Sequence, residues 1–336
     1  MWKRFLEEYG YIEKNYNQYL SIFIHIPKCA GGTITRHIVS KYSRDRYLDP
    51  YNERQAILKL TSLGDVDIDK ELRENPYLLK RSWIAEYVGS LGYRRREAIH
   101  SIIGHQVYYG IHELFEKPAR YFTFLREPFS RFVSFYNYMS TVRVTSQRLK
   151  ESGIIDEHDN IRSLDVWLEQ ADLAGNTMTS FLAQMYCGED LLPNKYTFST
   201  QDLVNAKKML GAMYFVGLTE NDNDVQFAYN RMGINFYKPD RNVLRIKSTY
   251  VLPSNMEAAR ELILSKYPYE QELYEYAVQL NQEMKSRIKD FEKAVSYTHF
   301  RRNISKRVNI VLQAGGLYKA FSDKARRLLG KISPAK

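Results

Sequence analysis

The sequence has only two cysteines, Cys29 and Cys187, in 336 residues. They form no C-x-x-C pair, so the sequence predicts neither a disulfide framework nor a zinc site. No apolar run reaches the roughly 18 residues that a membrane-spanning helix needs. Residues 1–20 also lack the apolar centre of a secretion signal. These absences favour a soluble protein of a reducing compartment, and we therefore expect a cytoplasmic location.

Most of the chain is close to neutral, and the net positive charge is concentrated at its C-terminal end. Residues 296–336 hold ten Lys and Arg against one acid, Asp323, which accounts for +9 of the net charge of +10. Because the rest of the chain is close to neutral, it is not a general binder of polyanions, and we expect no nucleic-acid partner. The tail has a basic amphipathic stretch that suits the inner membrane surface, an acidic polysaccharide or an exposed packing helix.

Short apolar segments alternate with helical patterns along the chain. Strand signals lie at residues 21–26, 102–103, 120–125 and 213–218. This alternation predicts an α/β fold with a P-loop-like parallel sheet, helices on both faces and helical insertions. We divide the chain into a polar helical extension at 1–20, one α/β domain at 21–295 and the basic tail at 296–336.

An anion-binding loop is the first candidate site. Residues 22–38 read IFIHIPKCAGGTITRHI, an apolar strand that runs into a bend of small residues and a helix. Backbone N–H groups at such a bend converge on an anion, which the helix dipole also attracts. Lys28 precedes the glycines, whereas the ATP-binding loop places its lysine after them. The glycines equally suit a tight strand–helix turn, so the loop alone leaves its role open.

A second candidate site follows the strand at 120–125. Arg126 lies at the carboxyl end of that strand, where ligands of open α/β sheets bind. Ser134 lies about two helical turns further on. We predict that Arg126 and Ser134 hold a second phosphate; the alternatives are an ion pair between Arg126 and Glu127 or another acid, and a packing role for Ser134. Arg131 is expected to point to solvent or to pair locally.

These motifs resemble those of sulfotransferases. IPKCAGGT is similar to their 5′-phosphosulfate loop, and LREPFSRFVSFY is similar to their 3′-phosphate motif. IIGHQVYYGIHELF, YFVGLTE and LRIKSTYVLPS resemble, in the same order, segments of the 2-O-sulfotransferases that act on uronic acids of glycosaminoglycans such as heparan sulfate. The resemblance spans roughly residues 21–290. One departure is Gly32, where relatives usually place Thr.

The resemblance implies a sulfotransferase that transfers the sulfuryl group of 3′-phosphoadenosine 5′-phosphosulfate (PAPS) to a hydroxyl of an oligo- or polysaccharide, leaving 3′-phosphoadenosine 5′-phosphate (PAP). Lys28 would stabilise the leaving oxygen, and His105 would act as the base. No metal is expected, because the sulfonate carries a single negative charge and no paired acidic motif is present. The implied nucleotide-binding residues are Lys28, Cys29, Ala30, Gly31, Gly32, Thr33, Arg126, Ser134, Arg245 and Ser248.

Other polar residues have two interpretations. His105 is either the base or a buried histidine satisfied by a backbone partner. His25 is expected to pack within a strand, and His100 and His112 to neighbour the acceptor site. Residues 176–180, NTMTS, either lie near the active site, as the resemblance implies, or cap a helix.

Other functions stay open. One is a sulfotransferase that acts on a non-carbohydrate alcohol or a glycolipid. Another is a non-catalytic polyanion-binding or membrane-binding protein with a decayed nucleotide site. A nucleotide-dependent kinase is disfavoured, because the chain has no G-x-x-x-x-G-K-[ST] motif and no convincing magnesium-holding acid after a strand. The oligomeric state is also left open.

Overall fold

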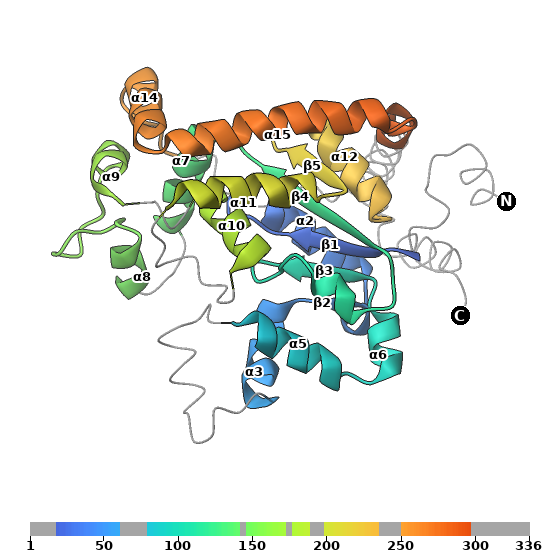
Figure 1. Cartoon of the computed structure of the whole chain (residues 1–336). Helices are drawn as coiled ribbons and strands as arrows, with labels where there is room; N and C mark the ends of the chain where they lie inside the picture. The colour runs from blue at the N-terminus through green and yellow to red at the C-terminus, as the bar shows by residue number, and fades with distance from the viewer. Residues whose placement is uncertain are drawn as a thin grey trace, which may run out of the picture.

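A computed structural model describes residues 18–60, 79–141, 146–172, 177–188, 198–234 and 250–296. At its centre lies a parallel five-stranded sheet in the order β2-β3-β1-β4-β5 (Figure 1). The strands are β1 Leu20–Ile24, β2 Tyr47–Leu48, β3 Ser101–Gly104, β4 Ala119–Leu125 and β5 Phe215–Leu218. The predicted extension and tail lie almost wholly outside the described residues, so the domain boundaries stay a prediction.

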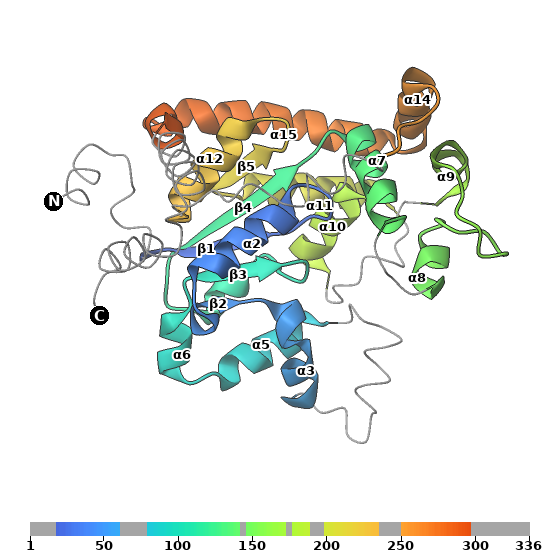
Figure 2. The same cartoon turned by 180° about the vertical axis from the view of Figure 1, so that it is seen from behind.

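Helices cover both faces of this sheet. The α-helices are α2 Gly31–Lys41, α3 Pro50–Leu60, α5 Arg81–Ser90, α6 Tyr93–Ala98, α7 Pro128–Met139, α8 Ser146–Glu151, α9 Leu164–Gln170, α10 Met178–Cys187, α11 Thr200–Gly211, α12 Asp222–Arg231, α14 Met256–Lys266 and α15 Pro268–Arg287. Helices α10 and α11 lie on one face, and α2 lies on the other (Figures 1 and 2). The predicted α/β fold with helices on both faces is therefore confirmed. No helix in the described ranges has both the length and the apolar character needed to cross a membrane.

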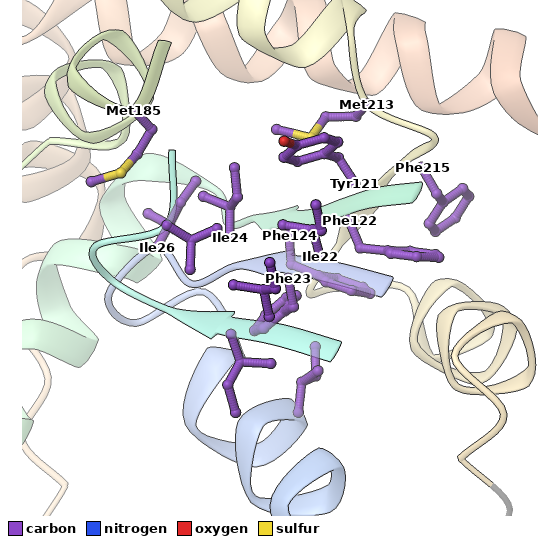
Figure 3. Close-up of a cluster of buried hydrophobic side chains, with 14 of the residues drawn as sticks. Ile22, Phe23, Ile24, Ile26, Tyr121, Phe122, Phe124, Met185, Met213 and Phe215 are labelled. Carbon is purple, nitrogen blue, oxygen red and sulfur yellow. The ribbon is translucent and has the colours of Figure 1, made fainter. Parts of the chain in front are cut away.

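The core explains why the central strands read as continuous apolar runs. Every residue of β1, LSIFI, is buried, because helices cover both faces of a parallel sheet. Aromatic and aliphatic side chains of β1, β4 and β5 pack together in this core (Figure 3). A second cluster joins α7, α9 and α14 around Phe132, Trp167 and Ile263. This second cluster anchors α7, the helix that follows β4.

The strand order predicts where a ligand binds. After β1 the chain runs outward to β2, whereas after β4 it runs to the opposite side and forms β5. In such sheets ligands bind at the carboxyl ends of the strands, where the two connections diverge. Here that point is at the ends of β1 and β4, which pair directly through Ile24 and Thr123.

Candidate active site

Three neighbouring strands deliver the predicted site residues to the same edge of the sheet. His25 follows β1 and leads into Lys28, His105 follows β3, and Arg126 follows β4. The first two segments stay joined beyond the strands, because the His25 N–H donates to the carbonyl of Gly104 over 3.0 Å. Sequence-distant residues therefore meet at the edge where the topology predicts a ligand.

The loop between β1 and α2 has an unusual backbone. Lys28 and Ala30 have φ values of 68° and 59°, a left-handed conformation that costs free energy for residues other than glycine. The N–H groups of Thr33 and Ile34 donate to the carbonyl of Ala30. Ala30 is the N-cap of α2, and its methyl side chain cannot cap the helix.

Gly31 therefore begins a helix whose first N–H groups are available. The N–H groups of Gly31 and Gly32 have no acceptor among the described residues. Unsatisfied N–H groups at a helix N-terminus, together with the helix dipole, form an anion-binding site. The two glycines differ in their surroundings. A Cβ atom at Gly31 would lie 1.7 Å from Cδ2 of His25, whereas one at Gly32 would meet nothing within 4 Å.

Two arginines brace this loop from below. Nη1 of Arg126 donates to the carbonyl of Lys28 over 3.4 Å, and Nε of Arg131 donates to the carbonyl of Pro27 over 3.1 Å. Arg131 is completely buried, so the expectation that it points to solvent is wrong. Its guanidinium instead supports the predicted anion loop.

The three cations of the site repel one another. Burial, followed by the positive charges of Arg126 and Arg131, lowers the pKa of Lys28 to about 8. The ammonium group of Lys28 lies 4.1 Å above the ring of Tyr138 on α7. A concentration of like charge of this kind is unfavourable in isolation and becomes favourable when an anion binds.

Arg126 is not engaged by the acid next to it in the sequence. Glu127 caps α7 by accepting from the N–H groups of Phe129 and Ser130, and its carboxylate pairs with Arg260 over 2.7 Å. Within the described residues Arg126 forms no ion pair with a carboxylate, so the alternative pairing with Glu127 does not occur. Its charge remains available to a ligand.

Ser134 lies on α7, two turns from the entrance of the helix. It is partly buried, and its hydroxyl has no hydrogen-bond partner in the described part of the chain. The segment that begins at Tyr250 docks on the same helix, because the side-chain amide of Asn137 exchanges hydrogen bonds of 2.6 and 2.9 Å with the backbone of Val251. Burial raises the pKa of Tyr250, and the charge of Arg126 opposes that rise. The first residue of this segment therefore lies near enough to Arg126 to interact with its charge.

The predicted residues Arg245 and Ser248 lie outside the described residues. They directly precede the segment that Asn137 holds, so the chain returns to α7 a few residues after them. This docking was not foreseen from the sequence, because an asparagine inside a helix gives no signal of a partner that is 114 residues away.

His105 has a defined tautomer. Its Nδ1 atom lies 2.7 Å from the carbonyl oxygen of His25. A carbonyl only accepts, so Nδ1 carries the hydrogen and the lone pair of the neutral ring is on Nε2. The backbone partner that the alternative interpretation required is therefore present, and it leaves a basic nitrogen on the opposite side of the ring.

The ring of His25 lies directly against His105. The ring centroids are 3.9 Å apart and the planes differ by 28°. Burial lowers the pKa of His25 well below its usual value, and the positive charges of His105 and Lys28 lower it further. His25 therefore packs as expected, but at the site itself rather than within the strand.

The other histidines lie elsewhere. His100 precedes β3 and stacks on Tyr42 at the amino edge of the sheet, opposite the edge that carries His105. His112 bonds through Nδ1 to the hydroxyl of Tyr121, 2.9 Å away. Neither contact brings them to the loop that contains Lys28.

The described part of the NTMTS segment caps a helix, as one interpretation held. Thr177 is the N-cap of α10 and forms a capping box with Ser180. The buried carboxylate of Glu270 accepts from the N–H groups of Met178 and Thr179.

Among the described residues, no group of three or more His, Cys, Asp and Glu side chains is arranged to hold a metal ion.

A comparison with models of known protein families found a match. The family model described as "Sulfotransferase family" matches residues 17–277, which is more than half of the chain. The matched region contains the β1–α2 loop, His105, Arg126 and Ser134. No curated protein matches the chain.

Proposed function

The chain belongs to the sulfotransferase family, and we propose that it uses PAPS to sulfate a hydroxyl of an oligo- or polysaccharide. The observation that carries this proposal is the meeting of Lys28, Arg126 and Arg131 at a loop whose first helical N–H groups are available. A nucleotide with phosphate groups at the 5′ and 3′ positions of its ribose would place one group at the β1–α2 loop and the other against Arg126.

The β1–α2 loop would hold the 5′-phosphosulfate. Its Gly31 and Gly32 residues offer N–H groups at the positive end of the α2 dipole, and Thr33 adds a hydroxyl. Lys28 brings a mobile cation to the same place. When bound, PAPS supplies the activated sulfuryl group.

The 3′-phosphate would lie against Arg126 and Ser134. Arg126 has no carboxylate partner in the described ranges, and the hydroxyl of Ser134 is unpartnered there. Arg245 and Ser248 are proposed to complete this half of the site, and the docking of the following segment on α7 supports their proximity. A guanidinium and a hydroxyl match the acceptor oxygens of a phosphate.

His105 would take the proton of the acceptor hydroxyl on Nε2. The acceptor oxygen then forms a bond to sulfur while the bond between sulfur and the bridging phosphate oxygen breaks. Lys28 would stabilise the negative charge that develops on that leaving oxygen. The proton ends on His105, and its Nδ1–H bond to the His25 carbonyl holds the ring in position throughout.

The carbohydrate acceptor is supported by the similarity of the sequence to sulfotransferases of glycosaminoglycans. A histidine base suits an alcohol, because the pKa of an alcohol lies far above neutrality and the alcohol needs deprotonation as it attacks. Sugars supply such alcohols. The same chemistry would accept a glycolipid or another alcohol, and the test below separates them.

Two measurements test the proposal. Calorimetry should detect binding of PAP in preference to ATP. Transfer of labelled sulfate from PAPS should then be measured to a panel of desulfated polysaccharides, with glycolipids and simple alcohols alongside. Lys28→Ala and His105→Ala should abolish transfer, whereas Lys207→Ala, which removes a surface lysine paired with Glu272, should leave it unchanged. Absence of PAP binding by folded protein would refute the proposal.

A further inference from the structure

His25 occupies a position between the two halves of the proposed chemistry. Its ring lies against the backbone of Gly31, the first residue of α2. The same ring stacks on the ring of His105, with 3.9 Å between the centroids. Its backbone also contacts both neighbouring segments, because its N–H donates to Gly104 and its carbonyl accepts from Nδ1 of His105.

We propose that His25 is a positioning residue that couples the phosphosulfate loop to the base. This inference rests on the function proposed above. The ring of His25 fills the space between Gly31 and His105, so a shift of the first turn of α2 is transmitted to His105 by direct contact. An anion drawn onto the N–H groups of Gly31 and Gly32 would thus set the ring of the base as well.

The contact with Gly31 is too close for any larger residue. A Cβ atom at position 31 would lie 1.7 Å from Cδ2, 2.2 Å from Nε2 and 2.5 Å from Cγ of His25. Atoms in proteins do not approach so closely, so one of the two groups would have to move. Gly31 lies within a helix and outside the left-handed region, which means that its backbone would accept alanine. The ring of His25 is therefore the obstacle.

The neutral state of His25 suits this role. Two imidazolium rings stacked face to face would repel each other, and burial together with the charges of His105 and Lys28 keeps His25 uncharged. The ring of Phe23 also stacks on His25, with 6.1 Å between the centroids, and adds no competing charge.

A double-mutant cycle tests the contact without any ligand. Gly31→Ala alone should lower the thermal unfolding midpoint by about 2–4 °C, because overpacking a tight site destabilises the fold. In the His25→Ala background the same change should cost less than about 1 °C, because the obstructing ring is gone. Equal losses in both backgrounds would show that the two residues do not meet, and would overturn the proposal.

A second measurement tests the positioning of the base. Nitrogen NMR of His105 should show a single Nδ1–H tautomer in the native protein and in His25→Phe, which keeps a flat ring on which His105 can stack. In His25→Ala the backbone carbonyl that accepts from Nδ1 remains, but the stacking ring is lost, so the His105 signals should broaden. Addition of PAP should shift the His105 signals in the native protein and in His25→Phe but not in His25→Ala. His105 signals that respond to PAP equally in all three proteins would overturn the coupling.

Turnover provides the third readout. On any acceptor that the panel identifies, His25→Ala should lower kcat by about tenfold or more while the affinity for PAP stays within about threefold of the native value. A loss of PAP affinity with unchanged kcat would assign His25 to the loop alone and overturn the proposal. Failure of the native protein to bind PAP is a separate result, because it refutes the proposed function and leaves the unfolding cycle intact.

Discussion

Binding of PAP should draw a proton onto Lys28. The pKa of this lysine is lowered to about 8, first by burial and then by Arg126 and Arg131. At pH 8 about half of the molecules therefore carry a neutral Lys28, and at pH 9 about nine tenths do. A bound phosphate group favours the ammonium form, so its pKa rises and a proton is taken up.

The magnitude follows from linkage. If the pKa of bound Lys28 lies above 10, PAP affinity is nearly constant below pH 7 and falls with pH above 8. Between pH 7 and pH 9 the loss is about tenfold, or about 1.4 kcal/mol. At pH 8 binding should take up about half a proton per site. The phosphate groups do not contribute in this range, because their second pKa lies near 6.

Calorimetry in two buffers with different heats of ionisation measures this proton uptake directly. Lys28→Arg is the matched control, since arginine keeps its charge at every pH used. Its PAP affinity should be constant from pH 7 to pH 9, and the two buffers should show that no proton is taken up when PAP binds. If the native protein also shows flat affinity, or if Lys28→Arg keeps the same pH dependence, the assignment of the site to Lys28 is wrong.

Three further changes have defined outcomes. Lys28→Met should raise the stability of the unliganded protein at pH 7 by on the order of 1–3 kcal/mol, since it removes a charge that burial and two arginines disfavour; the gain should shrink as pH rises from 8 towards 10.5, and chemical denaturation at several pH values measures it. Gly32→Thr should leave the unfolding midpoint nearly unchanged, because a side chain there meets nothing within 4 Å, and should raise PAP affinity by adding a hydroxyl; weaker binding would show that the bare backbone is required. Glu127→Ala should destabilise the protein by about 1 kcal/mol through loss of the α7 cap, and an unchanged denaturation midpoint would contradict this.

The parts of the site that the sequence predicts are those with a local signal. The β1–α2 loop is marked by an apolar strand, a bend of small residues and a helical pattern within 17 residues. Arg126 is marked by its position after a strand, where the topology of α/β sheets places ligands. Both follow from short-range pattern, which the fold then preserves.

The parts that were missed depend on distant partners. Arg131 lies between Ser130 and Phe132 on α7 and has no local signal of burial, yet one of its partners is the carbonyl of Pro27, 104 residues away. His25 looks like a strand residue, and its role depends on a ring 80 residues further along. The strand β2 has only two residues and is defined by its pairing with β3. It is too short to show the alternating pattern that predicts a strand.

The loop is supported by two positive charges of different kinds, the buried guanidinium of Arg131 and the amine of Lys28. A guanidinium stays ionised at any pH that a protein survives, whereas the amine of Lys28 can lose its proton under mildly alkaline conditions. The charge of Arg131 is therefore permanent and fixed by its bond to the Pro27 carbonyl, whereas the charge of Lys28 depends on pH. Raising the pH should consequently separate retention of the nucleotide, which the fixed charge partly sustains, from chemical turnover, which needs the adjustable one.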